Sequence, residues 1–495
     1  MLIVPRATRT LAVAAALALL AGCAPTPIAP PVESGIPTGF EAIYAQQVFW
    51  NDCGDTGFDC TTVSAPVDWS DPESDRIQLA VVRQESTNTT KGSVLTNPGG
   101  PGGSGFDFVS FGYAVTPAAK ADYDVIGWDP RGVGRSTRVT CFTDPAQTDE
   151  LLYGPEGDYD AEGAAFADAC GANSGELLAH MDTASNARDM DLIRAVVASE
   201  KLNYVGYSYG AFLGTVYAQL FPQNVGAMVL DGPYDPTLTR FGIFEGQSVG
   251  YDAAFRSYVE SCLRDPGCLF TGSVDNAVAQ AAALIASADT TRLKNDDGRV
   301  LDSATLATAV TSSLFSVQYW DSLSALLRAA STGDPGPAFA AADSANGRYS
   351  DGTYALNSLE VYTAVSCSDG PADDQSVADR LAQLEDAAPV VGGAFARVDF
   401  ARVESACENW PVAPAGLPAS WSATGAPTIL VVGTTNDPAT PYSWAQALVG
   451  ELDDAVLVTR NGDGHTGYNK GNACVDAAVD AFLLDGTVPA SDPNC

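Results

Sequence analysis

The feature that most constrains this chain is the five-residue segment Gly206-Tyr207-Ser208-Tyr209-Gly210. A largely apolar run at 202–205 precedes it and predicts a buried strand, and the run at 211–214 predicts a helix. A serine on a sharp strand-to-helix turn projects its hydroxyl from the edge of the sheet, and the two glycines leave room for neighbouring backbone. This context indicates a nucleophile elbow with Ser208 as the nucleophile. The alternative is a tight turn that buries an ordinary serine.

The rest of the chain fits an α/β-hydrolase fold with a mostly parallel central sheet. Short apolar runs predict strands at 77–84, 92–97, 123–128, 225–230, 428–433 and 455–459. Between 236 and 412 this alternation of strands and helices disappears, and alanine-rich segments of helical periodicity predict a large, mostly helical cap. We therefore divide the mature chain into a first core part (40–235), the cap (236–412) and a C-terminal core part (413–495).

Residues 1–39 are expected to export the chain rather than to join the fold. Two arginines precede an apolar run that is too short to span a bilayer. The run ends in Leu20-Ala21-Gly22-Cys23, which resembles a bacterial lipobox. We predict a signal peptide at 1–22, lipidation of Cys23 and a proline-rich tether at 23–39. The protein is then anchored by lipid on the outer face of the cell membrane; the alternative is a secretory signal that is cleaved nearby.

The cysteine content agrees with an oxidising compartment. The chain has eleven cysteines, so an even number remains if Cys23 carries lipid. Spacing alone does not determine their connectivity, but pairing sequential neighbours closes the shortest loops: 53–60, 141–170, 262–268, 367–407 and 474–495. Metal binding is the competing interpretation, and it is poor because no C-x-x-C spacing occurs and only two histidines exist. We expect neither a metal site nor a cofactor.

The charge balance excludes one class of partner. A formal net charge of −36 repels nucleic acid and anionic lipid headgroups. We therefore expect no nucleic-acid partner, and contact with the membrane only through the lipid anchor. Cationic or zwitterionic substrates are favoured over polyanions, although such an acidic surface can equally serve solubility. We expect a monomer.

An activated serine needs a general base, and the base needs an orienting carboxylate. The only histidines are His180 and His465. In this architecture the acid and then the histidine follow the serine along the chain, which excludes His180. His465 lies in a glycine-rich loop after the last predicted strand, and Asp437 lies in a turn after the strand before it. The predicted triad is Ser208, Asp437 and His465, with Asp231 as the alternative acid.

The expected oxyanion hole has two backbone donors. The first is the N–H of Tyr209, the residue after the nucleophile. The second comes from the glycine-rich loop at 97–105, in which the prolines have no N–H to offer. Gly100 is our choice and Gly99 is the alternative. A flexible glycine linker explains this segment less well, because the segment lies between two apolar strands.

Seven segments of the chain resemble the actinobacterial secreted tripeptidyl aminopeptidase family, which comprises α/β-hydrolases related to prolyl aminopeptidases. These segments are NPGGPGGSG at 97–105, DPRGVGRS at 129–136, NYVGYSYG at 203–210, VLDGPYDP at 229–236, CENWP at 407–411, TTNDPATP at 434–441 and GDGHTGY at 462–468. The resemblance extends over nearly all of the mature chain. It implies the same triad and the release of short peptides, such as tripeptides, from free N-termini through an acyl-enzyme. Some members are called only hydrolases or esterases, so a carboxylesterase with the same triad stays open.

An aminopeptidase must also hold the ammonium group of its substrate, which calls for carboxylates in the cap. Glu360, Asp369 and Glu404 are candidates, and ordinary solvated surface charge is the alternative for each. A lipoprotein that binds peptides without cleaving them is the remaining functional alternative. The presence of Ser208, Asp437 and His465 argues against it.

Overall fold

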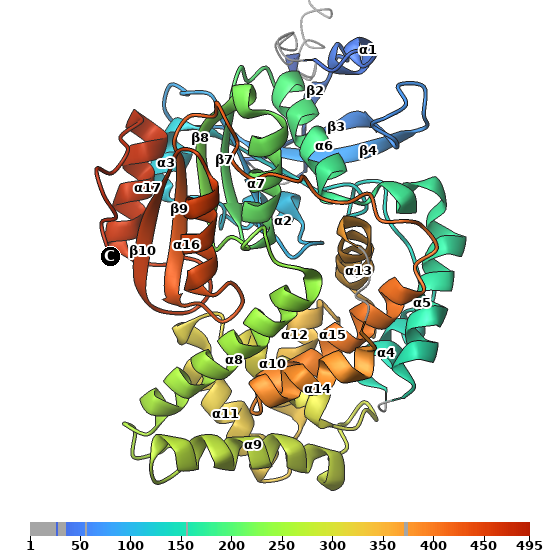
Figure 1. Ribbon diagram of the computed structural model, residues 1–495, viewed down its shortest axis with the longest axis vertical. Coiled ribbons are helices and arrows are strands. Elements are labelled where there is room, and N and C mark those ends of the chain that lie inside the picture. The colour runs from blue at the N-terminus through green and yellow to red at the C-terminus, as the bar shows by residue number, and fades with distance from the viewer. Residues whose placement is uncertain (1–25, 28–35, 55–56, 155–156, 371–374) are drawn as a thin grey trace, which may run out of the picture.

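The computed structural model describes residues 26–27, 36–54, 57–154, 157–370 and 375–495 (Figure 1). The predicted signal peptide and the lipidation site Cys23 lie outside these ranges and stay predictions. Within the described ranges, no helix has the length and apolar character needed to cross a membrane.

One mixed sheet organises the molecule. Its strands are β1 (Thr26–Pro27), β2 (Phe49–Asp52), β3 (Asp59–Pro66), β4 (Arg76–Gln84), β5 (Ser93–Asn97), β6 (Asp124–Trp128), β7 (Leu202–Tyr207), β8 (Val225–Asp231), β9 (Ile429–Asn436) and β10 (Ala455–Asp463). They pair in the order β1-β2-β3-β4-β6-β5-β7-β8-β9-β10. Pairing is antiparallel from β1 to β6 and parallel from β6 to β10. The predicted mostly parallel sheet is confirmed.

Burial on both faces explains why the central strands appear in the sequence as short runs of apolar residues. Nearly every residue of β7, β8 and the first part of β9 is buried, as expected for parallel strands covered on both faces. By contrast, β4 begins with alternating exposed and buried residues because it lies toward the antiparallel end of the sheet. The register sets Asn97 beside Gly206 and Tyr207 beside Asp231. The carboxyl ends of β5, β7 and β8 therefore meet at one edge of the sheet.

Helices cover both faces of the sheet. Alternate strand residues enter two different hydrophobic clusters, one packed under α6, α7 and α16 and the other under α2, α3 and α17. The helices of this α/β part are α1 (Glu41–Tyr44), α2 (Gly105–Ser110), α3 (Pro117–Asp122), α6 (Thr183–Val196), α7 (Tyr209–Leu220), α16 (Tyr442–Glu451) and α17 (Ala473–Asp485). This is the three-layer arrangement of the predicted fold.

Among the described residues between β8 and β9, the regular elements are helices joined by loops. This segment contains α8 (Arg240–Cys262), α9 (Val274–Thr291), α10 (Ser303–Ser313), α11 (Trp320–Ser331), α12 (Gly336–Asn346), α13 (Ser358–Asp369), α14 (Val377–Ala387) and α15 (Gly392–Glu408). A hydrophobic cluster of its own, including Phe255, Leu306, Leu327 and Phe339, holds much of this segment together. Figure 1 shows these helices grouped beyond one edge of the sheet, where they cap the α/β part.

Two features blur the boundary between cap and α/β part. Helices α4 (Pro145–Tyr153) and α5 (Tyr159–Ser174) precede the elbow in sequence, yet α5 packs against α15 of the cap (Figure 1). Conversely, Val361 and Ala364 of α13 join the hydrophobic cluster beneath α6 and α7. The helix α13 therefore packs against the α/β part, and α15 of the cap packs against α13.

Five disulfides connect the predicted sequential neighbours. They are Cys53–Cys60, Cys141–Cys170, Cys262–Cys268, Cys367–Cys407 and Cys474–Cys495. The fourth of these bonds ties α13 to α15. The expected pairing is confirmed, and it agrees with an oxidising compartment.

Candidate active site

Ser208 occupies a strained turn between β7 and α7. Its backbone has φ 57° and ψ −127°, a conformation that an L-residue adopts only when the surrounding structure imposes it. The Ser208 N–H donates to the carbonyl of Asp231 at 2.8 Å, which fastens the turn to the end of β8. Ser208 stays partly exposed while its neighbours Tyr207 and Tyr209 are buried. Of these three residues, only Ser208 lines the cavity described below.

The two glycines of the elbow are required by close backbone contacts. A Cβ at Gly206 would lie 2.3 Å from the Gly210 carbonyl oxygen, and a Cβ at Gly210 would lie 2.5 Å from the Asn97 carbonyl oxygen. The Tyr204 hydroxyl also donates to the Gly210 carbonyl at 2.7 Å. The G-x-S-x-G spacing therefore reflects packing of the turn against β5 and against itself.

His465 and Asp437 form a hydrogen-bonded pair. The Nδ1 atom of His465 lies 2.8 Å from Asp437 Oδ1 and 3.0 Å from Oδ2. Asp437 is buried, and its carboxylate also accepts the backbone N–H groups of Ala439, Thr440 and Thr466, each at 2.9 Å. These donors hold the carboxylate in one orientation. Because Nδ1 is engaged, Nε2 is the imidazole nitrogen left to face a substrate.

Asp231, the alternative acid, contacts the backbone of the histidine loop instead of the imidazole. Its buried carboxylate accepts the N–H groups of Gly467 at 2.9 Å and Tyr468 at 2.8 Å. Burial raises the pKa of Asp231 to about 6, although these two backbone donors and the nearby Lys470 act in the opposite direction. Asp231 therefore stabilises the backbone of the loop that carries His465, whereas Asp437 contacts the imidazole itself.

The glycine-rich loop lies directly against the elbow. A Cβ at Gly99 would come within 2.5 Å of the Tyr207 carbonyl oxygen and 2.9 Å of the Tyr209 nitrogen. The Gly99 N–H donates to Asn97 Oδ1 at 2.9 Å, so this group already has a partner. Gly100, with φ 114°, lines the same cavity as Ser208. Of the two glycines considered for the second oxyanion donor, Gly100 is the one with its backbone at the cavity.

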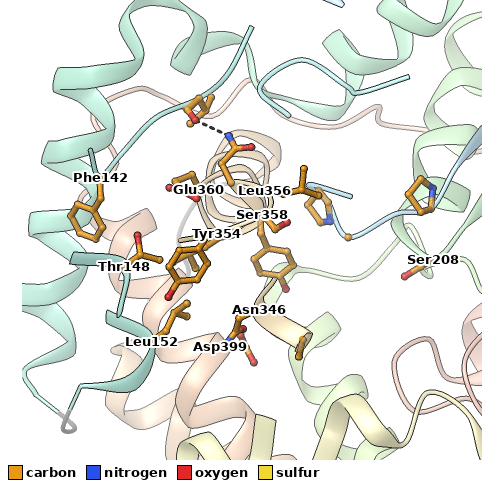
Figure 2. Close-up of a pocket in the computed structure, with 18 of the residues that line it drawn as sticks. Phe142, Thr148, Leu152, Ser208, Asn346, Tyr354, Leu356, Ser358, Glu360 and Asp399 are labelled. Carbon is orange, nitrogen blue, oxygen red and sulfur yellow. Dashed lines mark hydrogen bonds between the residues drawn. The ribbon is translucent and has the colours of Figure 1, made fainter. Parts of the chain in front are cut away.

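A cavity of about 980 Å³ lies between the sheet edge and the cap. Gly100, Ser208 and His465 form its wall on the α/β side. Figure 2 shows Ser208 at one end of this space and a group of cap and α4 side chains at the other. That far group includes Thr148, Leu152, Asn346, Tyr354, Glu360 and Asp399. The cavity is thus long enough to bring groups of the cap and the elbow to the same ligand.

The cap also supports the histidine, a role that the sequence did not suggest. The carbonyl of Phe315 accepts the His465 backbone N–H at 2.9 Å, and the two rings lie 5.1 Å apart. Phe315 follows α10, far from His465 in sequence. Phe315 contributes its backbone carbonyl, which every residue has, so the sequence does not indicate this role.

The three cap carboxylates named from sequence have three different surroundings. Glu360 lines the cavity that contains Ser208. Asp369 lines a second cavity of about 450 Å³, where its carboxylate accepts the N–H and the hydroxyl of Thr183 at 2.7 and 2.6 Å. Burial raises the pKa of Asp369 to about 7. The Thr183 hydroxyl also lies 2.7 Å from the Tyr209 hydroxyl, so Asp369 is linked to the elbow.

Glu404 is not available to a substrate ammonium group, so this candidate is wrong. Its buried carboxylate pairs with Arg240 at 2.7 and 3.0 Å and with Arg380 at 2.8 Å. Two guanidinium groups already neutralise it. Sequence reasoning missed Asp399 instead, which lies one turn and a half earlier on α15 and lines the cavity with Ser208.

The DPRGVGRS segment at 129–136 has a structural role. The Arg131 guanidinium is fully buried, and it binds the Asp189 carboxylate through two hydrogen bonds of 2.8 Å. It also donates to the carbonyls of Pro66, Val67 and His180. Arg131 thereby joins the end of β3 to α6, and His180 contributes its backbone carbonyl to this network.

Known proteins resemble this chain along most of its length. The family described as TAP-like protein matches residues 393–495. The serine protease Hip1 of Mycobacterium tuberculosis is 32% identical over 91% of both chains, and carboxylesterase B of the same species is 35% identical over 92% of this chain and 91% of its own. The tripeptidyl aminopeptidase of Streptomyces lividans is 30% identical over 90% of this chain and 86% of its own. The chain belongs to the α/β-hydrolase family of serine hydrolases that contains these proteins.

Proposed function

We propose that this protein is an exported serine aminopeptidase that releases short peptides, tripeptides above all, from free N-termini through an acyl-enzyme. The observation that carries the proposal is the cavity in which Ser208, on a strained elbow, and His465, paired with Asp437, share one wall. Relatives named serine protease and tripeptidyl aminopeptidase support peptide substrates. The cavity volume of about 980 Å³ lies at the upper end of the range of roughly 300–1,000 Å³ for ligand pockets, which leaves room for a substrate of several residues.

In the proposed reaction Ser208 Oγ attacks the scissile carbonyl while His465 Nε2 takes the hydroxyl proton. The imidazolium that forms is stabilised by the Asp437 carboxylate, which is held ready by three backbone N–H groups. His465 then gives the proton to the leaving amine. A water molecule, activated by the same base, hydrolyses the ester of Ser208 and restores the enzyme.

The developing oxyanion is assigned to the backbone N–H groups of Tyr209 and Gly100. Tyr209 N is the first helical nitrogen of α7, so the positive end of the helix dipole also faces the oxyanion. Donors fixed in advance stabilise the tetrahedral intermediate without reorganisation at the moment of reaction, and each contributes roughly 3–4 kcal/mol. The glycine-rich loop supplies this rigidity because its contacts with the elbow leave no room for a side chain at Gly99.

Export is supported by features on both sides of Cys23. The predicted signal peptide and lipobox precede it, and five disulfides follow it. Disulfides persist outside the reducing cytoplasm. We propose that the mature protein is a lipid-anchored monomer on the outer face of the membrane. The predicted tether at 23–39 is not wholly separate from the fold, because Thr26–Pro27 pair with β2 as strand β1.

A carboxylesterase is the second candidate, because carboxylesterase B is as similar to the chain as the peptidases are. The same triad cleaves esters and amides, so the triad cannot discriminate between them. The experiment compares three substrates: a tripeptide anilide with a free N-terminus, its N-acetylated form and a short-chain nitrophenyl ester. The peptidase proposal expects the free anilide to be preferred over the acetylated one and Ser208→Ala to abolish its hydrolysis. Hydrolysis of the ester alone contradicts it.

Labelling by a fluorophosphonate separates both candidates from a non-catalytic peptide-binding protein. We expect the probe to modify the wild-type protein and to leave Ser208→Ala unmodified, because only an activated serine attacks it. Peptide binding without any labelling contradicts both enzyme candidates.

A further inference from the structure

Tyr209 is fixed in the structure by its side chain as well as by its backbone. Its backbone N–H is the first of the two assigned oxyanion donors, and only 5% of the residue is exposed. The Tyr209 hydroxyl lies 2.7 Å from the hydroxyl of Thr183, a fully buried residue that begins α6. Burial raises the pKa of the Tyr209 hydroxyl well above its usual value. The hydroxyl therefore keeps its proton and can donate a hydrogen bond.

Thr183 is held in turn by the cap. Asp369, the last residue of α13, accepts the Thr183 backbone N–H through Oδ1 at 2.7 Å and the Thr183 hydroxyl through Oδ2 at 2.6 Å. The first N–H groups of a helix have no partner within that helix, so the carboxylate satisfies the start of α6 from a neighbouring element. Both oxygens of Asp369 thus contact the same threonine.

The available protons give these contacts a direction. An ionised carboxylate only accepts hydrogen bonds, so the single hydroxyl proton of Thr183 is used toward Asp369. The contact between the two hydroxyl groups must then be donated by Tyr209. A chain of two hydrogen bonds therefore runs from the Tyr209 hydroxyl through Thr183 to the carboxylate, and it joins α7, α6 and α13. Hydrogen bonds that end on a charged group are stronger than neutral ones.

The backbone around Ser208 needs such an anchor because it is strained. With φ 57°, the turn persists only while the surrounding structure imposes it. On one side of the turn, the Ser208 N–H is fastened to the Asp231 carbonyl at 2.8 Å. On the other side, the Tyr209 side chain is fastened to Thr183. Oxyanion donors act at about 2.7–3.1 Å from the oxygen that they stabilise, so a small shift of the Tyr209 N–H is costly.

We propose that Asp369 and Thr183 are positioning residues for the oxyanion hole, which they fix through the Tyr209 hydroxyl. The inference rests on the proposed assignment of the Tyr209 N–H as an oxyanion donor, and it applies equally to amide and ester hydrolysis. Neither positioning residue has to touch the substrate. Because Asp369 belongs to the cap, the cap contributes to the geometry of the elbow as well as to the wall of the cavity.

The test removes single links of this chain and uses a short-chain nitrophenyl ester, so that its outcome does not depend on peptidase activity. Tyr209→Phe loses the hydroxyl and keeps the ring. We expect its kcat and kcat/KM to fall together by about 10- to 100-fold, with KM within about threefold of wild type, because only transition-state stabilisation is affected. Thr183→Val should behave in the same way. Thr183→Ser, which keeps the hydroxyl, should retain nearly the wild-type kcat.

A second readout reports on the oxyanion hole without turnover. When an alkyl trifluoromethyl ketone binds, Ser208 Oγ adds to its carbonyl carbon, the serine proton passes to His465, and the carbonyl oxygen becomes an oxyanion. We measure its affinity as protection of Ser208 from fluorophosphonate labelling. This affinity should fall in Tyr209→Phe by the same factor as kcat/KM. Combining Tyr209→Phe with Thr183→Val should cost no more than the more severe single variant, because both residues act through one chain.

The matched control is Tyr217→Phe, which removes the hydroxyl of another buried tyrosine of α7, toward the end of the helix that is remote from Ser208. That hydroxyl donates to Asp191 Oδ1 at 2.9 Å. The control should lose stability in denaturant unfolding with no change in kcat or in ketone affinity. Wild-type kcat and ketone affinity in Tyr209→Phe, equal losses in Tyr217→Phe, or additive losses in the double variant overturn the positioning role. Absence of fluorophosphonate labelling in the wild type would instead overturn the proposed function itself.

Discussion

Asp437 and Asp231 both contact the loop that carries His465, but they have different roles. Asp437 contacts the imidazole, and Asp231 contacts the backbone two and three residues beyond it. In Asp437→Asn the side-chain amide cannot stabilise the imidazolium, so kcat should fall by roughly 1,000- to 10,000-fold. In Asp231→Asn the main loss should be stability, about 1–3 kcal/mol of the free energy of unfolding.

Steady-state kinetics and denaturant unfolding of the two variants distinguish these effects. The labelled fraction of Ser208 in each preparation corrects for any inactive protein. A larger loss of kcat in Asp231→Asn than in Asp437→Asn contradicts the assignment of the orienting acid.

The pH dependence of substrate choice is a further residue-scale prediction. Burial raises the pKa of Asp399 to about 6 and also raises the pKa of Glu360. The charged group that opposes this rise is Arg402 for Asp399 and Arg138 for Glu360. Burial, and to a smaller extent the nearby Asp399 carboxylate, in turn raise the pKa of Tyr251 and Tyr362. A raised pKa means that Asp399 becomes neutral as the pH falls through about 6, and a neutral carboxyl binds ammonium poorly.

The preference for the free amine over the acetylated amine should therefore decline as the pH is lowered from 7.5 to about 5. It should also decline above about pH 8, where the α-amino group of the peptide loses its proton. The ratio of kcat/KM values over this range is the measurement. A ratio that is constant with pH contradicts a role for these two carboxylates.

Single residues differed in how far the sequence could predict them. Ser208, Asp437 and His465 could be named because the elbow has a distinctive spacing, histidine is scarce and the chain order is restrictive. Asp399 could not, because it is one acid among 61 Asp and Glu residues and lies in a segment of ordinary helical character. Glu404 was misjudged for the same reason, since nothing in the sequence indicates that Arg240 and Arg380 converge on it.

At the scale of elements, the helices α13 and α15 carry the cap side of the site. The bond Cys367–Cys407 has a sequence separation of 40 and joins them, so replacing both cysteines by serine should lower the free energy of unfolding by about 2–4 kcal/mol. It should also weaken the preference for a free amine, because α13 and α15 both contribute side chains to the wall of the cavity that contains Ser208.

The matched control is the Cys53–Cys60 pair, whose cysteines are 7 residues apart in sequence and lie in the antiparallel part of the sheet, outside the cap. Its replacement should cost less stability and leave substrate preference unchanged. Equal changes of preference in the two variants would argue that the disulfide between α13 and α15 has no special connection with the site.

Elements with strong local patterns were predicted well, and those defined by tertiary contacts were not. The strands that flank the site are buried on both faces, so short apolar runs identify them. The packing of α13 on the α/β part and of α5 on α15 depends on which faces meet in space, which periodicity does not record. The support of His465 by the Phe315 carbonyl is invisible for the same reason.

At the scale of the whole molecule, we propose that this acidic, disulfide-bonded enzyme is held outside the cell by its lipidated N-terminus. Cys23→Ala removes the predicted lipid attachment point. We expect this variant, expressed in a bacterial host that processes lipoproteins, to move from the membrane fraction to the soluble exported fraction. Specific activity should be unchanged, because the tether is remote in sequence from Ser208, Asp437 and His465. Retention in the membrane fraction contradicts the anchor.

The most direct test of the central claim is product analysis of an unlabelled peptide of about ten residues by mass spectrometry over time. We expect successive loss of tripeptides from the N-terminus, no reaction of the N-acetylated peptide, and no products with Ser208→Ala. Cleavage at internal bonds regardless of acetylation, or an intact peptide in the presence of enzyme that labels with fluorophosphonate and hydrolyses esters, would contradict it.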